Sequence, residues 1–202
     1  GLANGWSRLH NVAESEDSLM MRRALQQMGV CVRESVRKTC GGMSLDICGV
    51  NGRPRLSSGE SINPGNAGAV LRFLLGIGAL LPEVAFVTDR PDSLGKRPHG
   101  DLLEALEQLG CRCESQNGGY LPIVLRGGRL HGGVVSVSGV KSSQYLSALL
   151  FLAPLVGDPV EIGVRDRLVS RAPVRQTLEV IRSAGVQVTW SDDLTRFSVM
   201  PS

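Results

Sequence analysis

Aromatic side chains are scarce in this sequence: two Trp, two Tyr and four Phe make up 4% of its 202 residues. Modules that bind nucleic acid typically stack bases on aromatic rings and carry a strongly basic face. The net charge here is only +3, and no basic nucleic-acid motif is present. We therefore expect no nucleic-acid partner. A non-enzymatic nucleic-acid-binding repeat domain remains the alternative, because the sequence contains nineteen arginines.

Long hydrophobic runs are also missing. The longest run, residues 70–81, is interrupted by Arg72, Gly76 and Gly78 and is too short to span a bilayer. No signal peptide opens the sequence, so a cytoplasmic location without membrane contact is expected. Apolar residues nevertheless make up 42% and charged residues 20%, which is typical of a globular protein with a substantial core.

The cysteines favour neither disulfides nor zinc. Their number is odd, and the chain is long enough to fold without cross-links. The separation of Cys111 and Cys113 is wrong for a zinc site, and the three histidines are scattered. We predict no metal and reduced, mostly buried thiols at all five positions: Cys31, Cys40, Cys48, Cys111 and Cys113.

Common catalytic motifs are absent as well. The Gly-Lys pair at 95–96 is followed by Arg97 and lacks the upstream glycine of a Walker motif. No G-x-G-x-x-G follows a strand, and no G-x-S-x-G is present. The histidines have no evident nucleophile partner, and His99 is expected at a helix entry. We therefore assign no catalytic residue, and we expect Trp6 and Trp190 to pack.

The sequence does contain a repeat. A helix, a strand, an Asp-Arg pair, a second helix and two strands are predicted from residue 66, and the same order follows from residue 143. The offset is 77 residues for three pairs: Asn66 and Ser143, Asp89 and Asp166, Ser93 and Ser170. The predicted helices are 66–80, 100–109, 143–155 and one ending at Gly185; the predicted strands are 84–87, 111–115, 121–125, 160–164, 186–190 and 196–200.

A third copy precedes these two. The stretch SRLHNVAESEDSLMMRRALQQMGV predicts a strand, an acidic turn and a helix, with Gly29 at the place of Gly110 and Gly185. A glycine after each helix is typical of a left-handed C-terminal cap. This copy has no opening helix. We predict an α/β body in one domain, residues 1–202, with helices inside and sheets outside; its repeats are about 1–60 (truncated), 61–132 and 133–202.

The start of the helix at residue 66 suits an anion. Asn66 is a favourable N-cap, and Gly65 and Gly68 allow backbone amides to approach a ligand closely. Arg72 follows about one and a half turns into an apolar helix. It either extends to water, as in an ordinary capped helix, or faces a polar site.

The equivalent positions carry further polar groups. Ser142, Ser143 and Gln144 stand at the matching helix start, and two loops contribute cations or hydroxyls: Lys96 and Arg97, then Ser170 and Arg171. Approximate threefold symmetry would bring the helix starts to one end of the molecule. Together these groups predict a substrate that carries several negative charges.

Four stretches, in this order, resemble the enolpyruvyl transferases: GNAGAVLR, SLGKRPHGDLLEALEQLG, SSQYLSALL and LVSRAPVRQTLEVIRSAGV. The resemblance is greatest to the transferases that act on shikimate 3-phosphate, and it covers essentially the whole chain. It implies one of two lobes, each built from three βαβαββ repeats with outer four-stranded sheets. It also implies transfer of the enolpyruvyl group of phosphoenolpyruvate to the 5-hydroxyl of shikimate 3-phosphate, without metal or organic cofactor.

The resemblance also implies site residues. Those matching phosphoenolpyruvate contacts are Asn66, Gly68, Arg72, Arg97 and Gln144; those matching shikimate 3-phosphate contacts are Ser142, Ser143, Gln144 and Ser170. Ala69 stands where the family usually has threonine, and Pro173 stands near the place of a common tyrosine.

The family's lysine-serine motif and second lobe are not in this sequence, so we expect no turnover from the chain alone. The nearest rival is a lobe of a UDP-N-acetylglucosamine 1-carboxyvinyltransferase. The reactive loop of that enzyme normally carries a cysteine, which residues 88–97 lack.

Overall fold

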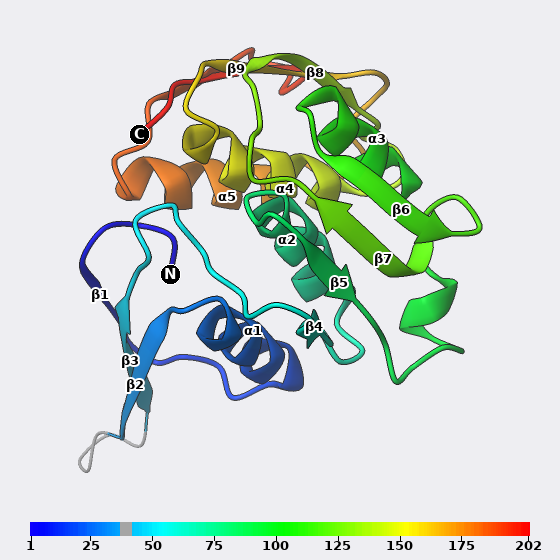
Figure 1. Ribbon diagram of the computed structural model, residues 1–202. Coiled ribbons are helices and arrows are strands. Elements are labelled where there is room, and N and C mark those ends of the chain that lie inside the picture. Colours follow the sequence, from blue (N-terminus) through cyan, green and yellow to red (C-terminus); the bar gives the residue numbers. More distant parts are fainter. Residues whose placement is uncertain (37–41) are drawn as a thin grey trace.

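The computed structural model describes residues 1–36 and 42–202 of the chain. Its elements fall into three successive groups along the sequence (Figure 1). The first group is β1 (Trp6–Leu9), α1 (Glu16–Gln27), β2 (Cys31–Val36) and β3 (Met43–Cys48). The second is β4 (Ser61–Ile62), α2 (Gly68–Gly78), β5 (Val84–Phe86), the 3₁₀ helix η1 (Leu94–Lys96), α3 (Gly100–Gln108), β6 (Arg112–Gln116) and β7 (Tyr120–Arg126). The third is β8 (Gly133–Val137), α4 (Ser143–Leu152), the 3₁₀ helix η2 (Ala153–Leu155), β9 (Val160–Val164), α5 (Ala172–Ser183), β10 (Val188–Trp190) and β11 (Arg196–Val199).

The two later groups build sheets of the same design. Their strand orders are β4-β5-β7-β6 and β8-β9-β11-β10. In both, the first pair is parallel and the other two pairs are antiparallel. The sheet of the first group has three strands in the described residues, β1-β3-β2, and both of its pairs are antiparallel. The predicted α/β class is therefore confirmed.

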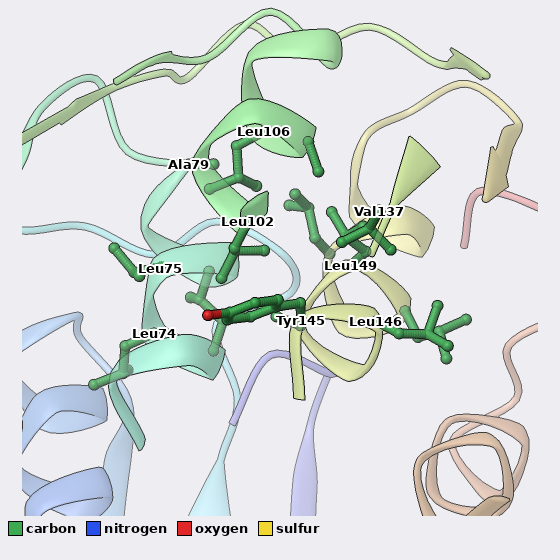
Figure 2. Packing of buried hydrophobic residues seen from close by; sticks show 14 of the residues in the cluster. Leu74, Leu75, Ala79, Leu102, Leu106, Val137, Tyr145, Leu146 and Leu149 are labelled. Atoms are coloured by element: carbon green, nitrogen blue, oxygen red, sulfur yellow. The ribbon is translucent and has the colours of Figure 1, made fainter. Parts of the chain in front are cut away.

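The helices α2 and α4 form the centre of the molecule, and the sheets lie around them (Figure 1). Eight of the eleven residues of α2 are buried, because its sequence is apolar on nearly every side. A Cβ on Gly76 would lie 2.8 Å from the Ala148 carbonyl oxygen of α4, so the absence of a side chain there lets the two helices approach closely. Figure 2 shows side chains from three helices in this core: Leu75 of α2, Leu102 of α3, and Tyr145 of α4.

The first group buries fewer apolar side chains than the other two. Its sheet covers a separate small cluster of four buried residues: Val30, Met43, Leu45 and Ile47. Its helix α1 has one buried residue, Ala24, whereas the amphipathic helices α3 and α5 have four each. The stability of this sheet therefore depends on few apolar contacts.

The predicted N-cap of α2 is wrong. Asn66 is exposed, and Ala67 occupies the cap position. The preceding turn explains the shift: Gly65 has φ +66°, its N–H donates to Asn63 Oδ1 at 2.9 Å, and the Ala67 N–H reaches the Pro64 carbonyl at 3.4 Å. The tight turn therefore sets where α2 begins.

The expectation that both tryptophans pack is confirmed for Trp190 and wrong for Trp6. Trp6 is 55% exposed on β1, where the Arg33 guanidinium lies 4.8 Å from its ring centroid; Trp190 is half-buried against the main core. The described cysteines are free thiols, but only Cys111 is buried. The expectation of mostly buried thiols is wrong, since outward strand positions leave Cys31 exposed; Cys40 lies outside the described residues.

Candidate functional site

Two guanidinium groups meet at the first turn of α2. A Cβ on Gly68 would lie 2.6 Å from Nη1 of Arg97 and 3.5 Å from Nη1 of Arg72. Arg97 comes from the loop before α3, and Arg72 comes from α2 itself. Glycine at position 68 therefore leaves the space that lets both cations lie beside the helix start.

The Arg72 side chain faces a polar site. It is half-buried, and its Nη1 donates a hydrogen bond to Oε1 of Gln144 at 2.5 Å. Its guanidinium lies 5.3 Å from the centroid of the Tyr145 ring, and the Tyr145 hydroxyl donates to the Pro98 carbonyl at 2.7 Å. These contacts connect α2, α4 and the 97–98 segment into one arrangement.

The start of α4 is held from two sides. The Gln144 N–H donates to Oγ of Ser142 at 3.2 Å, which makes Ser142 the N-cap. In the preceding loop, the Ser138 hydroxyl and the Gly139 N–H each donate to the Asp166 carboxylate at 2.7 Å. Loss of water around Asp166 acts to raise its pKa, but these hydrogen bonds outweigh that effect and hold the pKa below its usual value.

An ion pair joins the same loop to α3. Lys141 Nζ lies 3.0 Å from Oδ2 of Asp101, which is in the first turn of α3. The hydrogen bond to Asp101, together with the charge of that carboxylate, raises the pKa of Lys141. The loop that carries Ser142 and Ser143 is therefore anchored to both neighbouring chain segments.

A neutral imidazole lies beside the two arginines. His99 precedes α3 and is fully buried. Burial, and then the positive charges of Arg72 and Arg97, lower its pKa to about 4. Among the described residues, neither ring nitrogen of His99 has a hydrogen-bond partner. The Nε atom of Arg72 also has no partner there. Buried polar atoms without partners are uncommon, so this cluster has unused capacity for hydrogen bonds.

The structure brings part of the predicted set together. Gly68, Arg72, Arg97 and Gln144 form one cluster, with Ser142 and Ser143 at the start of the same α4 helix. Three other predicted polar residues are exposed: Asn66, Ser170 and Arg171. The 169–170 segment lies near the α4 loop, since the Val169 N–H donates to the Gly139 carbonyl at 3.3 Å. Lys96 instead pairs with Asp92 at 2.9 Å.

Sequence reasoning missed three supports of this cluster. The Arg72 guanidinium lies over the ring of Tyr145, and Asp166 accepts hydrogen bonds from the loop before α4. His99 is buried rather than being only a helix-entry residue. The 77-residue offset between Asp89 and Asp166 was a sequence signal for Asp166. No sequence pattern indicated the roles of Tyr145 and His99.

Two negative findings apply to residues 1–36 and 42–202. No group of three or more His, Cys, Asp or Glu side chains could hold a metal ion there. No helix in the same ranges is long and apolar enough to cross a membrane.

A family model for EPSP synthase (3-phosphoshikimate 1-carboxyvinyltransferase) matches residues 1–202. This chain belongs to the EPSP synthase family. A 3-phosphoshikimate 1-carboxyvinyltransferase of Deinococcus radiodurans is 50% identical over 198 residues, which cover 98% of this chain and 43% of the relative. One of Shewanella sp. (strain MR-7) is 34% identical over 200 residues, covering 98% of this chain and 46% of the relative. The chain thus spans less than half the length of these EPSP synthase relatives.

Solved structures give the same fold. EPSP synthase from Acinetobacter baumannii matches with a TM-score of 0.81 at 21% identity, over 100% of this chain and 42% of that one. The enolpyruvyl transferase NikO from Streptomyces tendae matches with a TM-score of 0.65 at 12% identity, over 99% and 44%. The resemblance read from the motifs is therefore confirmed. The UDP-N-acetylglucosamine alternative and the nucleic-acid alternative gain no support from these matches.

Proposed function

We propose that this chain is the substrate-binding lobe of a transferase that moves the enolpyruvyl group of phosphoenolpyruvate to the 5-hydroxyl of shikimate 3-phosphate. The supporting observation is the convergence of Arg72 and Arg97 on the side-chain-free surface of Gly68, with Gln144 bonded to Arg72. Two guanidinium groups at a helix N-terminus suit a small phosphorylated carboxylate, because each can donate paired hydrogen bonds to an oxyanion.

Each residue of the cluster has a distinct part in this proposal. Arg72 and Arg97 bind the phosphate and carboxylate of phosphoenolpyruvate. Gln144 uses its Oε1 to orient Arg72, which leaves its amide N–H groups for a ligand. Because His99 is neutral, it adds no third positive charge to the pair of cations.

Shikimate 3-phosphate binds at the adjacent start of α4 in this proposal. Ser142 and Ser143 present hydroxyl groups beside backbone N–H groups at that helix end. Ser170 approaches from the neighbouring segment, which is hydrogen-bonded to Gly139. Ala69 adds no hydroxyl at the α2 start, so phosphoenolpyruvate is held there by backbone and arginine groups.

The proposal assigns the chemical step to a two-lobed enzyme. In an open half-site, water screens the arginines, and closure by a second lobe would lower the local dielectric and strengthen their pull on an anion. The chain spans 43% of its Deinococcus radiodurans relative. The acid and base groups for addition and elimination then come from the remaining part.

A chimera tests this proposal. The 198 residues of the Deinococcus radiodurans relative that match this chain are replaced by the chain itself, and phosphate release is followed with phosphoenolpyruvate and shikimate 3-phosphate. We expect activity in the chimera and none in the isolated chain. Arg72→Ala should abolish turnover, whereas Arg129→Ala, at an exposed position, should not.

Three results would contradict the proposal. The first is a folded chimera without activity, and the second is a folded chimera that prefers UDP-N-acetylglucosamine as acceptor; either outcome removes the assigned reaction. Micromolar or tighter binding of shikimate 3-phosphate by the isolated chain, measured by calorimetry, would show that one lobe suffices for binding.

A further inference from the structure

Two cysteines face each other across the first sheet. Cys31 opens β2, Cys48 ends β3, and the antiparallel register pairs them directly. Residues opposite each other in an antiparallel pair project to the same face. The next pair, Val32 and Ile47, packs into the small cluster beneath the sheet, so both thiols are on the outer face.

The backbone spacing suits a cross-link. The Gly49 N–H donates to the Gly5 carbonyl, on the β1 side, at 2.9 Å. Because successive residues of a strand direct their N–H and C=O groups to opposite sides, those of Cys48 point toward β2. Hydrogen-bonded antiparallel pairs have Cα atoms about 5.5 Å apart, and disulfides join Cα atoms about 4.4–6.8 Å apart. The Cβ atoms would have to approach by about 1 Å. A disulfide closed in this way is more readily reduced than an unstrained one.

We propose that Cys31 and Cys48 form a reversible dithiol–disulfide site on this outer face, separate from the substrate cluster. The oxidant is a low-molecular-weight disulfide of the glutathione class. The exposed Cys31 thiolate attacks one sulfur of the oxidant and releases one thiol. Cys48, which is half-buried, then attacks the Cys31 sulfur and releases the second thiol. Two protein thiols and one disulfide give one protein disulfide and two small thiols.

The second pair of close cysteines differs in burial and in titration. A contact between Sγ and a carbonyl oxygen does not distinguish it, because Cys48 Sγ also lies 4.0 Å from the Gly49 carbonyl oxygen. Cys111 is buried, and its Sγ lies 3.8 Å from the Arg112 carbonyl oxygen. Cys113 is partly buried, and its Sγ lies 3.6 Å from the Leu103 carbonyl oxygen. The hydrogen bond with Cys111, and then burial, strongly raise the pKa of Cys113. The Cys113 thiol therefore stays protonated. The same hydrogen bond lowers the pKa of Cys111, but burial keeps the Cys111 thiol away from an oxidant in solvent.

The cross-link would act on the sheet that covers the smaller of the two apolar clusters. The sheet covers only the four-residue cluster described above, so its strands are expected to open before the main core does. Joining β2 to β3 stabilises this sheet locally, without a contact to Arg72 or Arg97. Trp6 is the register partner of Cys48 on β1, so its fluorescence reports the state of the pair.

The test uses a Cys40→Ser background, both in the 202-residue chain and in the chimera, so that misfolding of one protein does not decide the result. Each is equilibrated with oxidised and then reduced glutathione, and cross-links are mapped by peptide mass spectrometry. We expect a Cys31–Cys48 disulfide that reverses on reduction, with Cys111 and Cys113 still open to alkylation after unfolding. In Trp190→Phe protein, the Trp6 emission should change with oxidation, and Cys48→Ser should remove that change.

Two outcomes would overturn the proposal. In one, Cys31 carries only glutathione and Cys48 stays a free thiol in both proteins. In the other, the cross-link joins Cys111 to Cys113 instead. Turnover of the chimera is recorded in the same samples, so that failure of this proposal is distinguished from failure of the proposed function.

Discussion

At the scale of single residues, the absence of a side chain at Gly68 shapes the site. Gly68 has no positive φ in the structure, so alanine fits its backbone, but the added Cβ would lie 2.6 Å from Nη1 of Arg97. Gly68→Ala should therefore move the Arg97 guanidinium and raise the KM of the chimera for phosphoenolpyruvate about tenfold or more, which corresponds to the loss of one charge-assisted hydrogen bond. Steady-state kinetics measure this change.

Gly163→Ala is the matched control for that variant. Its added Cβ would meet nothing closer than the Val135 carbonyl oxygen at 3.9 Å. The control should leave the KM for phosphoenolpyruvate unchanged. Equal effects of the two variants would show that Gly68 matters only for folding.

The buried His99 predicts a pH dependence of stability. Its pKa is about 4 in the folded chain and near 6.5 when unfolded, so the unfolded state binds more protons between these values. The free energy of unfolding therefore falls as the pH drops through this window, by about 2–3 kcal/mol from His99 at pH 4.5. His99→Met should remove that part of the loss, as measured by urea unfolding at pH 7 and pH 4.5.

The exposed His131 provides the comparison. His131→Gln should keep the full decrease in stability between pH 7 and pH 4.5. If His99→Met lost as much stability on acidification as the unmodified chain, then the burial of the imidazole would not govern this pH dependence.

At the scale of elements, the start of α4 has a structural role in addition to the ligand-binding role proposed for it. Ser142 caps the helix through the bond from the Gln144 N–H. Ser142→Ala should lower the free energy of unfolding by about 1 kcal/mol without any ligand present. Ser143→Ala, one residue later and outside the cap position, should change it much less; thermal denaturation of both variants measures the difference. Equal destabilisation would contradict the cap assignment.

The helix starts also show what sequence could predict. Periodicity and the 77-residue offset predicted α2, α3, α4 and α5 and most of the strands, because those patterns follow directly from which face is buried. The N-cap at Asn66 was wrong because a turn through Gly65 begins the helix at a different residue. The burial of His99 and its place beside Arg72 depend on packing between helices distant in sequence, which no local pattern carries.

At the scale of the whole molecule, the two apolar clusters differ greatly in size. The main core joins all three groups of elements, whereas the sheet β1-β3-β2 covers a separate cluster of four buried residues. Opening of that sheet exposes little apolar surface compared with opening the main core. Local unfolding and global unfolding should therefore be separate events in this chain.

Two leucine truncations distinguish these events. Leu45 in β3 belongs to the small cluster and Leu125 in β7 to the main core, and each is 2% exposed or less. Either change to alanine removes buried contacts that contribute about 2–5 kcal/mol. Leu45→Ala should speed amide hydrogen exchange in β2 and β3 and leave β7 unchanged, because β7 packs on the main core. Leu125→Ala should speed exchange in every sheet, and a global effect of Leu45→Ala would mean that the two clusters unfold as one unit.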